Sequence, residues 1–599
     1  MIIRLTPAMS AGLTLLAGSL LATDTLANDD VVLVTATRAE QSIDESLAAV
    51  TVIDRDRLEL SQASDLLELL RLEAGLDINR TGGPGGQTSV FMRGSNSNHV
   101  LVLIDGVRVA ASGTGAFAWE LLDINLIDRI EIVRGPRAAR WGSDAIGGVI
   151  QIFTRQTEGA QVRLGYGRYR DRNLSASVGN GQHSLTVSGR RVGGFSSQNE
   201  RGFAFDPDDD GLETFSASGR GQFDLNNGQL GWHARFVSGE VEFDRGESDV
   251  LNYATGFDYR LNPLGDWQLM ASAAAYRDRL ETEAPFGNSE AVTRRLQGSL
   301  QAERPLTSAQ RLLMGVDAWQ ESGVNRNQWS ESRHNLGAWI GIDGQSGAVN
   351  HDASLRVDRD QLFGSAVTGN LAGGWRFNAQ WQAYGSLGKG FRAPNFSQLY
   401  SPGFSGLFAG NPDLDPETSW SSELGLRWQN ETGHSASLAA FQTRISDLID
   451  FAGENFRAIN VRRARIEGLE VSHQYSANQW RSQLQYTWQD AEDRDSGLPL
   501  LRRPSQKAGG SVDWLSERGG WLGLESFYNG SRRDIGQQRL PSYTLVNLRA
   551  GWPLTERVRL EGRLENLTDR DYEQLIGFNT PGRSLFVAIH WHSDPTSRR

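Results

Sequence analysis

The chain has 599 residues, no cysteine, 67 glycines, 17 tryptophans and a formal net charge of -12. Its acidic residues are spread along the sequence, which argues against a nucleic-acid-binding protein, because such proteins cluster Lys and Arg against phosphates. The absence of cysteine excludes a disulfide framework and thiol chemistry.

The first segment, residues 1–27, is typical of a cleaved secretory signal peptide. Arg4 precedes a mostly apolar stretch from Ala8 to Ala22, and Thr25-Leu26-Ala27 matches the small-residue pattern that signal peptidase recognises. The alternative is an N-terminal membrane anchor, which the shortness of the apolar stretch disfavours. Because no other run of about 18 apolar residues follows, the mature protein is either a soluble exported protein or an outer-membrane barrel.

The second segment, Asp30 to Ala36, has the sequence DVVLVTA. It is rich in β-branched residues and flanked by polar ones, so we expect an extended conformation. An extended segment can add a strand to an exposed sheet edge, where backbone hydrogen bonds supply the affinity. The alternative is an ordinary first strand of the domain that follows.

Residues 38–156 predict a compact mixed α/β domain. SQASDLLELLRLEAG predicts an amphipathic helix that begins at Ser61 or Ser64 and ends at Gly75. Apolar strand-like runs follow at His99 (HVLVLIDGVRV), Asp128 (DRIEIVRG) and Gly147 (GGVIQIFT). Because this domain directly precedes a predicted barrel, we expect it to fill the barrel lumen as a plug.

Four arginines recur in the predicted plug, with Glu131 and Asp144 nearby: Arg93, Arg134, Arg137 and Arg140. We expect them to pair with charges on the lumen wall and to hold the plug by many wet, individually modest contacts. A direct role in ligand binding is the alternative.

From about residue 160 onward, segments recur in which apolar and polar residues alternate strictly. In WRSQLQYTWQ, from Trp480 to Gln489, aromatic and aliphatic residues fall on one face and arginine, glutamine and threonine on the other. The segments from Glu423 to Trp428 and from Val558 to Glu565 repeat the pattern. Such segments run near ten residues and often carry an aromatic residue at one end, as expected for strands between lipid outside and water inside.

The residues from 157 to 592, at roughly 20 residues per strand and turn, give about 22 antiparallel strands. A membrane β-barrel of that size has a lumen that is normally plugged. A soluble β-propeller is the alternative, but the sequence has no repeat of blade length. The residues from 593 to 599, SDPTSRR, extend beyond the closing strand, whereas most such barrels end on a terminal phenylalanine.

The stretch DPDDDGLE places Asp206, Asp208 and Asp210 at alternate positions before a glycine, as a calcium loop begins. An EF-hand is excluded, because the twelfth position holds Ala217 where that loop needs a bidentate glutamate. No zinc-protease or nucleophile motif occurs, so the sequence does not indicate an enzyme.

Three motifs resemble those of the TonB-dependent outer-membrane receptors. RIEIVRGPRAARWGSDAIGGVIQIFT, from Arg129 to Thr154, is similar to the end of that family's plug. GKGFRAPNFSQLY (Gly388–Tyr400) with NPDLDPE (Asn411–Glu417) is similar to its mid-barrel signature, and ENLTDRDYE (Glu565–Glu573) to the signature before the closing strand. The resemblance covers essentially the whole mature chain.

Within the family, several segments of the chain resemble those of the cobalamin receptors. HVLVLIDGVRV from His99, RISDLIDF from Arg444, RRARIEGLEV from Arg462 and PLLRRPSQ from Pro499 resemble their segments. The resemblance implies active import of cobalamin across the outer membrane, driven by the inner-membrane proton-motive force through TonB, ExbB and ExbD. Import of a ferric siderophore or another corrinoid, or passive passage through a porin, are the alternatives.

The resemblance also implies roles for individual residues. Within the segment 28–37 it identifies Asp30, Val31, Val32, Leu33, Val34, Thr35 and Ala36 as the Ton box, which the periplasmic TonB protein grips. It assigns cobalamin contacts to two plug loops, through Gln87, Thr88, Ser89 and Val90 in the first and through Phe117 and Trp119 in the second. Plain flexible turns are the alternative for both loops.

Calcium is implied in the same way, with Asp206, Asp208, Asp210 and Asp244 as ligands from two acidic extracellular loops. The chain departs from the family pattern at two positions: Phe243 stands where the family has tyrosine, and Ser196 where we expect a further aspartate. A merely solvated acidic loop is the alternative.

Overall fold

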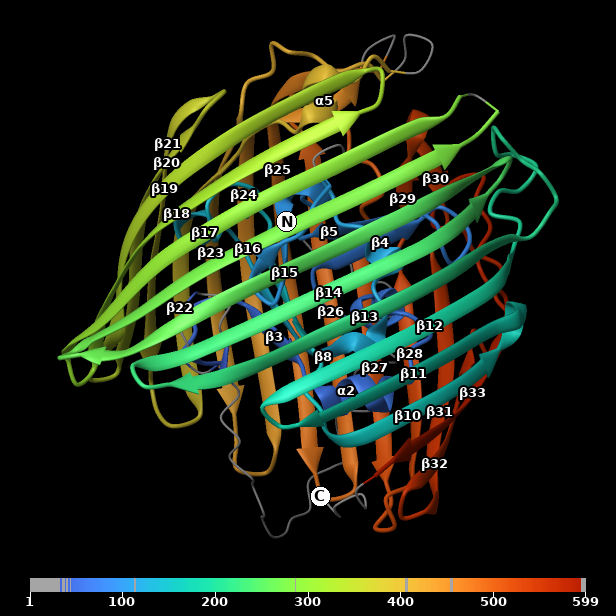
Figure 1. Cartoon of the computed structure of the whole chain (residues 1–599), viewed down its shortest axis with the longest axis horizontal. Helices are drawn as coiled ribbons and strands as arrows, with labels where there is room; N and C mark the ends of the chain where they lie inside the picture. The colour runs from blue at the N-terminus through green and yellow to red at the C-terminus, as the bar shows by residue number, and fades with distance from the viewer. Residues whose placement is uncertain are drawn as a thin grey trace, which may run out of the picture.

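The computed structural model describes residues 33–34, 38, 41–43, 45–111, 115–285, 287–403, 408–452 and 456–593. Within these residues a closed barrel of 22 antiparallel strands surrounds an N-terminal domain of mixed helices and strands (Figure 1). The prediction of a large barrel with an α/β plug in its lumen is confirmed. In the same residues no helix has the length and apolar character needed to cross a membrane.

Each barrel strand pairs with its neighbours in chain order, and the first strand closes the ring by pairing with the last. The barrel strands are β10 (Glu158–Gly167), β11 (Asp171–Asn180), β12 (His183–Phe195), β13 (Asp210–Leu225), β14 (Gly228–Phe243), β15 (Gly246–Leu264), β16 (Trp267–Glu283), β17 (Ser289–Thr307), β18 (Gln310–Asn325), β19 (Trp329–Ser346), β20 (Val349–Asp360), β21 (Gly364–Arg376), β22 (Trp381–Arg392), β23 (Glu417–Gln429), β24 (His434–Ala452), β25 (Arg457–Ala477), β26 (Trp480–Asp493), β27 (Gln506–Leu515), β28 (Trp521–Asn529), β31 (Tyr543–Thr555), β32 (Val558–Glu565) and β33 (Ser584–His592).

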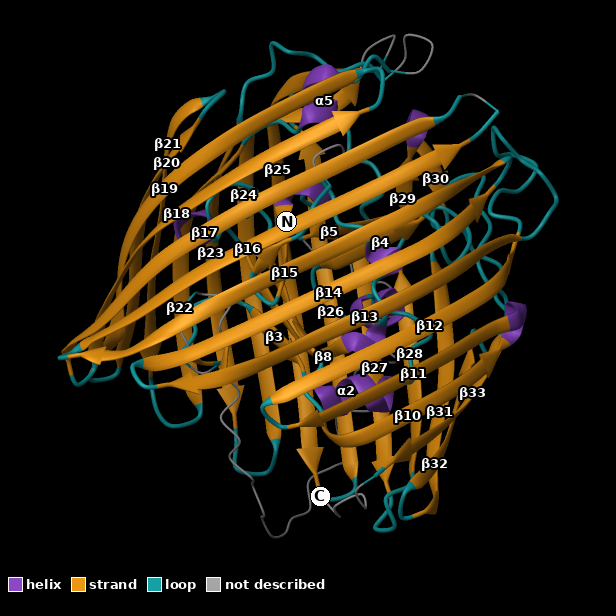
Figure 2. Ribbon diagram, viewed as in Figure 1, coloured by secondary structure: helices purple, strands orange, loops and turns teal. Residues whose placement is uncertain are grey.

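The barrel strands range from 8 to 21 residues, so many exceed the length near ten that the alternation indicated. Figure 2 shows long strands that continue beyond the middle of the barrel toward its upper loops. Those extensions carry charged residues on their outer side, for example Glu240 on β14, so the apolar alternation ends before the strand does. The sequence pattern therefore marks the lipid-facing part of each strand.

The two faces of the barrel strands are as predicted. On β23, Leu424 is 72% exposed on the outer face, whereas its neighbour Glu423 is only 6% exposed and lies on the lumen side. On β26, Trp480 and Leu484 point outward, while Gln485 is buried against the plug. Lipid outside and a polar lumen inside account for this alternation.

The plug contains a five-stranded sheet in the order β3-β8-β9-β6-β7, in which only β6 and β9 run parallel, and a separate β4-β5 hairpin. Its strands are β1 (Leu33–Val34), β2 (Gln41–Ser42), β3 (Val50–Ile53), β4 (Leu76–Arg80), β5 (Thr88–Met92), β6 (Val100–Ile104), β7 (Val107–Arg108), β8 (Ile127–Arg134) and β9 (Gly148–Thr154). Its helices are α2 (Arg55–Ser61), α3 (Leu66–Leu70), α4 (Ala138–Trp141) and the 3-10 turns η2 (Ser97–His99), η3 (Trp119–Leu121) and η4 (Ile124–Leu126). The barrel loops add α5 (Phe396–Tyr400), η5 (Arg168–Arg170), η6 (Ile535–Gln537) and the β29-β30 hairpin (Arg532–Asp534, Gln538–Leu540).

The single helix predicted from Ser61 or Ser64 to Gly75 is wrong. Instead α2 ends at Ser61, and the five-residue α3 begins after Asp65, whose side chain accepts a hydrogen bond from the amide of Glu68. The chain then leaves the helix before Gly75, because this stretch turns to meet the barrel wall. The N-cap was misplaced since Ser64 and Asp65 are both good caps and propensity does not choose between them.

The plug core is apolar and continuous. Leucines of α2 and α3 pack with isoleucines and valines from both plug sheets, and the barrel residues Ala254 and Tyr276 complete the cluster. Burial of each such side chain is worth about 1.5–3 kcal/mol. The core therefore holds the plug as one body inside the barrel.

Candidate functional site

Arg93 ties the plug to two strands of the lumen wall. Its guanidinium donates to Glu423 Oε2 at 2.6 Å and to Glu470 Oε2 and Oε1 at 2.7 and 2.9 Å. The same group lies 4.4 Å from the ring centre of Phe441. Arg93 and both glutamates are buried, so these contacts are not the wet ones that the sequence suggested. Removing one partner from such a buried set leaves an unpaired charge.

The other plug arginines divide in their partners. Arg140 donates to Asp352 of the barrel at 2.6 Å, which confirms the expected pairing with the lumen wall. Arg134 donates to the carbonyl of Ala74 within the plug at 2.8 Å, and its Nε also lies 4.0 Å from Glu470 Oε1 of the wall. Arg137 bonds the carbonyl of the neighbouring Pro136 at 3.2 Å. Charge pairing across the interface is therefore confirmed for Arg93, Arg134 and Arg140.

The segment Glu73–Asp77 binds the wall through its backbone. The amide of Gly75 donates to Thr487 Oγ1 at 2.9 Å, and Lys507 Nζ donates to the carbonyl of Glu73 at 2.8 Å. Gly75 has φ +69, and a Cβ there would lie 2.2 Å from Glu470 Oε1. Only glycine satisfies both conditions without a shift of the wall.

A buried histidine joins three of the sequence motifs. His99 Nδ1 accepts the amide of Asn96 at 3.3 Å, so Nε2 donates to Glu417 Oε2 at 2.9 Å. Arg392 donates to the same oxygen at 2.7 Å. His99 begins the HVLVLIDG stretch, Arg392 lies in GKGFRAPN and Glu417 ends NPDLDPE. Sequence reasoning did not single out these three residues for a shared role, although each lies in a motif that it quoted.

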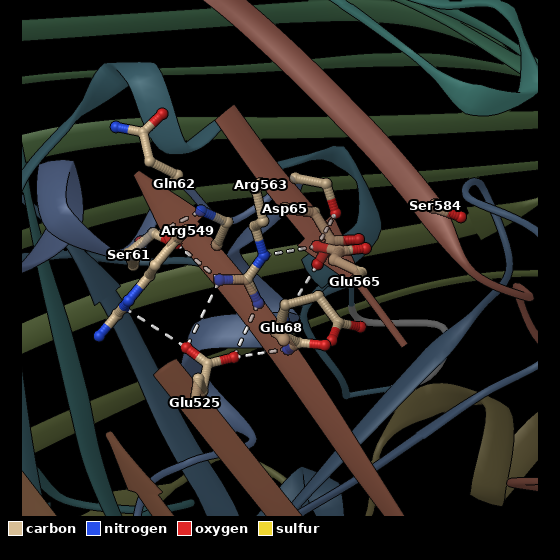
Figure 3. Close-up of polar contacts among 12 residues, drawn as sticks. Ser61, Gln62, Asp65, Glu68, Glu525, Arg549, Arg563, Glu565 and Ser584 are labelled. Carbon is tan, nitrogen blue, oxygen red and sulfur yellow. Dashed lines mark hydrogen bonds and ion pairs between the residues drawn. The ribbon is translucent and has the colours of Figure 1, made fainter. Parts of the chain in front are cut away.

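At the closing strands, Arg563 links two barrel glutamates to the plug (Figure 3). It donates to Glu525 Oε1 and Glu565 Oε1, each at 2.8 Å, and to the carbonyl of Ser61 at 2.6 Å. Ser64 Oγ donates to the same Glu565 oxygen at 3.1 Å. The end of α2 and the residues before α3 are thus fixed to β28 and β32.

Most of the predicted Ton box lies outside the described residues: Asp30, Val31, Val32, Thr35 and Ala36. Leu33 and Val34 form β1, which pairs antiparallel with Ser42 and Gln41 of β2. The predicted signal peptide, 1–27, and the tail after Ser593 also lie outside the described residues. The Ton box assignment stays a prediction.

Just after β1, Arg38 fastens the leading segment to the barrel. Its Nη1 lies 2.7 Å from Asp317 Oδ1, and its carbonyl accepts from Gln301 Nε2 at 2.8 Å. Its guanidinium lies 4.4 Å from the ring centre of Trp141. The sequence signal was an isolated arginine next to the extended segment, which sequence reasoning did not use.

The predicted ligand loops present few of the residues assigned to them. In the first loop Gln87 is exposed and Ser89 partly exposed, whereas Thr88 and Val90 are buried. In the second loop Phe117 and Trp119 pack edge to face, with ring centres 5.1 Å apart, inside the plug core. Contact of these two rings with a ligand requires the loop to move.

Glu120, next to Trp119, lies in an environment that disfavours the charged form of its carboxyl group. Burial raises the pKa of Glu120 to about 8. Its Oε2 has no hydrogen-bond partner among the described residues. Glu120 lines a polar cavity of about 40 Å³ between the plug and the barrel, together with Asp123 and Arg190. A cavity of that size holds one or two water molecules.

The acidic loops approach one another without forming a ligand cluster. Asp244 Oδ1 accepts the amide of Asp206 at 3.0 Å, and Asp210 Oδ2 accepts the amide of Ser197 at 2.6 Å. Asp244 Oδ2 is buried without a donor, and burial, with the nearby charge of Asp208, raises the pKa of Asp244. Across the described residues no three His, Cys, Asp or Glu side chains are placed to share a metal ion.

Of the two departures from the expected pattern, Ser196 has a structural role in its loop, and Phe243 ends β14, where it pairs with Gly246 across the turn to β15. Ser196 Oγ lies 2.8 Å from the carbonyl oxygens of both Asp206 and Gln198, and its single hydrogen is donated between them. Ser196 therefore fixes the course of the acidic loop, and neither residue offers a carboxylate to a cation.

Comparison with known proteins extends over almost the whole chain. Residues 42–149 match the TonB-dependent receptor plug domain, and residues 150–567 match the TonB-dependent receptor-like β-barrel. A vitamin B12 transporter, BtuB, from Vibrio vulnificus is 30% identical over 600 residues, covering 94% of this chain and 95% of the relative. The protein of the same name from Photobacterium profundum is 29% identical over 589 residues, with the same coverage.

Solved structures share the fold. The ferric enterobactin receptor PfeA of Pseudomonas aeruginosa matches with a TM-score of 0.77 at 17% identity, covering 94% of this chain and 100% of that one. The siderophore receptor PirA of Acinetobacter baumannii matches with a TM-score of 0.75 at 17% identity, covering 92% and 99%. Because the plug and barrel models together match residues 42–567, the protein belongs to the TonB-dependent receptors, a family of outer-membrane receptors and transporters rather than enzymes.

Proposed function

We propose that the protein imports cobalamin across the outer membrane, with energy delivered by TonB from ExbB and ExbD in the inner membrane. The observation that carries the proposal is the 30% identity, over 94% of the chain, to a vitamin B12 transporter. The siderophore receptors share only 17% identity, which supports a common fold and not a common cargo. No chemistry on the ligand is needed, so the absence of a catalytic motif agrees with transport.

Energy coupling is proposed to act on Asp30–Ala36. In the described part of this segment, the backbone of Leu33 and Val34 is already paired with β2. TonB would take the place of β2 by adding its own strand to this segment. Pull on the segment would then reach Arg38, the next fixed point, and break its contact with Asp317. Deleting residues 30–36 should abolish uptake and spare binding at the cell surface; uptake that survives the deletion would favour a passive porin.

Cobalamin is proposed to contact the plug through its apical loops. Gln87 and Ser89 are accessible in the first loop, and Phe117 and Trp119 become accessible only if the second loop rearranges. Such a rearrangement gives the ligand a way to influence the plug, because a ligand shifts an equilibrium only through different affinities for its two states.

Calcium is proposed to order the acidic loops before the ligand binds. Asp206, Asp208, Asp210 and Asp244 supply hard oxygen donors, and the unpaired buried Oδ2 of Asp244 fits a cation. Pre-ordered loops lower the conformational entropy that ligand binding must overcome. Calorimetric titration of calcium should show binding to the wild type and none to the Asp206/Asp208/Asp210→Ala variant. Equal heats of titration for the two proteins would favour the alternative, a solvated acidic loop that does not bind calcium.

The cargo is tested by equilibrium binding of radiolabelled cobalamin to purified protein with and without calcium. We expect saturable binding, strengthened by calcium. Ferric enterobactin serves as the competitor, because a solved structure of the same fold is named as its receptor. No cobalamin binding with calcium present, or displacement by the siderophore, would replace the proposed cargo with an iron chelate.

A further inference from the structure

A groove of about 420 Å³ opens on the outer wall of the barrel, where the first and last strands close the ring. It is lined by the end of β10, the η5 turn and the start of β33: Tyr166, Gly167, Arg168, Tyr169, Arg170, Leu564, Arg583, Leu585 and Val587. The groove lies at the end of the barrel that carries the long loops. In this family that end faces the cell exterior.

The lower part of the groove is apolar and faces lipid. Tyr166 and Leu585 are each 56% exposed and Val587 is 43% exposed. Val587 stands opposite Tyr166 across the closing seam, so the side chains share one face. They continue the outward apolar row of Leu164 and Ile589 at the upper edge of the membrane band. A hydrocarbon chain fits along this floor.

The upper part of the groove is positively charged. Arg168, Arg170 and Arg583 line its rim, and Arg172 stands directly opposite Tyr166 on the neighbouring strand. Arg170 pairs with Asp209 at 3.0 Å and Arg583 approaches Asp569 at 3.8 Å, each pair largely exposed. Exposed pairs of this kind are worth about 0–1 kcal/mol, so an anion can displace them.

Arg168 is the least engaged of these arginines. Its guanidinium donates to the carbonyl of Arg583 and lies 4.8 Å from the ring centre of Tyr169. Among the described residues no carboxylate lies within ion-pair distance of it. An arginine over an aromatic ring keeps its remaining donors directed outward, and its planar fork suits phosphate oxygens.

The turn that carries the arginines is held in a strained, fixed shape. Tyr169 and Arg170 have φ +60 and +59, a left-handed conformation that costs non-glycine residues about 1–3 kcal/mol each. The hydroxyl of Tyr169 accepts the amide of Gly582 at 3.0 Å and so ties this turn to the segment before Arg583. The turn that carries Arg168 and Arg170 and the segment that carries Arg583 are therefore held together across the seam.

The neighbouring outer rim has the opposite charge. Glu213, Glu240, Asp249 and Glu281 form a cross-strand row on the outer face of β13 to β16, with each residue opposite the next. Like charges placed directly opposite repel one another and repel an anion. On this flank of the barrel, the seam is thus the place where an anionic headgroup is attracted.

We propose that this seam groove binds a lipid with a phosphorylated headgroup from the outer leaflet. Arg168, Arg170 and Arg583 hold the phosphate, while Tyr166, Leu585 and Val587 support an acyl chain. The occupant follows from charge complementarity above an apolar, lipid-facing floor. The proposal requires only the membrane location of the barrel and is independent of the cargo.

The test is native mass spectrometry of the full chain, released from detergent after titration with dioleoyl phosphatidic acid or dioleoyl phosphatidylcholine. Wild type should prefer phosphatidic acid, and Arg168→Gln/Arg583→Gln should bind it about tenfold more weakly, with phosphatidylcholine unchanged. The matched control is Arg326→Gln, an exposed arginine on the rim that pairs with Glu290. It should retain wild-type affinity.

Two further binding measurements distinguish a lipid ligand from a free anion. Dihexanoyl phosphatidic acid should bind at least about tenfold more weakly than the dioleoyl lipid, because it loses the apolar floor. Inorganic phosphate at millimolar concentration should not displace the dioleoyl lipid. Equal loss in Arg326→Gln, equal affinity for both chain lengths, or displacement by inorganic phosphate would each overturn the proposal. If the double variant fails to fold, Arg168→Gln alone with the same lipids gives the comparison.

Discussion

The interior of the plug and its contact with the β23–β27 wall differ in the kind of interaction that predominates. The interior is a continuous apolar cluster from α2, α3 and both plug sheets. The contact with the wall includes a small apolar cluster, in which Ile146 packs with Phe441 and Ile466. To this it adds buried charges and backbone hydrogen bonds, centred on Arg93 and on Glu73–Asp77. Apolar packing fixes the shape of the plug, whereas the directional polar contacts at this wall restrict its position more narrowly.

This difference teaches that shape and position can be disturbed separately. Apolar contacts tolerate small shifts, because they are not directional. A buried ion pair stabilises the fold only when its geometry is good, and the loss of one partner is strongly destabilising. A plug that must stay in place and yet yield to a pull benefits from this division of roles.

Arg93→Ala should give the largest effect and separate position from shape. It leaves Glu423 and Glu470 buried without their cation, at a cost of about 3–5 kcal/mol. We expect faster hydrogen exchange in Glu73–Asp77 and the wall strands, with the plug core still protected. Loss of protection throughout the core would contradict the separation.

The control for Arg93 restores charge balance without restoring the contact. Arg93→Met combined with Glu423→Gln and Glu470→Gln should recover much of the stability, since neither position then carries a buried carboxylate that has lost the Arg93 cation. Arg93→Lys should lie between, because an ammonium group loses the paired fork to Glu470. A triple variant as unstable as Arg93→Ala would mean that the geometry, and not the charge, carries the energy.

Leu70→Ala tests the other side of the comparison. Leu70 is fully buried in α3, and the truncation should cost about 2–5 kcal/mol through lost burial and a residual cavity. Hydrogen exchange should rise in α2, α3 and the plug sheet while the Arg93 contacts persist. The matched control, Leu164→Ala on the lipid face, should leave plug exchange unchanged. If hydrogen exchange became faster only at the wall contacts, the result would contradict the assignment of shape to the apolar core and of position to the polar contacts.

At acidic pH, Glu120→Gln should give the smallest effect, because both side chains are uncharged there, and the two proteins should differ in their pH dependence. Because the pKa of Glu120 is raised from 4.5 to about 8, its favourable contribution is complete below about pH 4.5 and is lost as pH rises through about 8. The slope for one group is at most about 1.4 kcal/mol per pH unit. Exchange in residues 117–126, corrected for intrinsic rates, should accelerate with pH in the wild type and not in the variant. An identical pH profile in both would place the ionisation elsewhere.

The architecture of the barrel was predictable, because lipid and water impose a two-residue period on every strand. Glu423 and Leu424 fall on opposite faces as expected. The early end of α3 at Leu70 was not predictable, since the stretch that follows it is held by the wall, where the amide of Gly75 donates to Thr487, a residue far away in sequence.

The residues of the site were harder to predict from the sequence than the fold was. Arg93 was recognised as a plug anchor, but its partners Glu423 and Glu470 become identifiable only once the strands are placed around the plug. Phe117 and Trp119 are aromatic residues in a glycine-rich loop, and composition alone does not distinguish ligand contact from core packing. Calcium binding and the Ton box stay predictions.

The pairing of β10 with β33 has a consequence for biogenesis. The strand that closes the ring is the last to be made, and the plug precedes the whole barrel in the chain. Pairings between such distant segments form late, because a long loop must close first. The contact of Ser61 with Arg563 joins an early plug helix to one of the last barrel strands, so it can form only after nearly the whole chain has been made. Closure of the ring and this anchoring of the plug thus depend on the same late part of the chain.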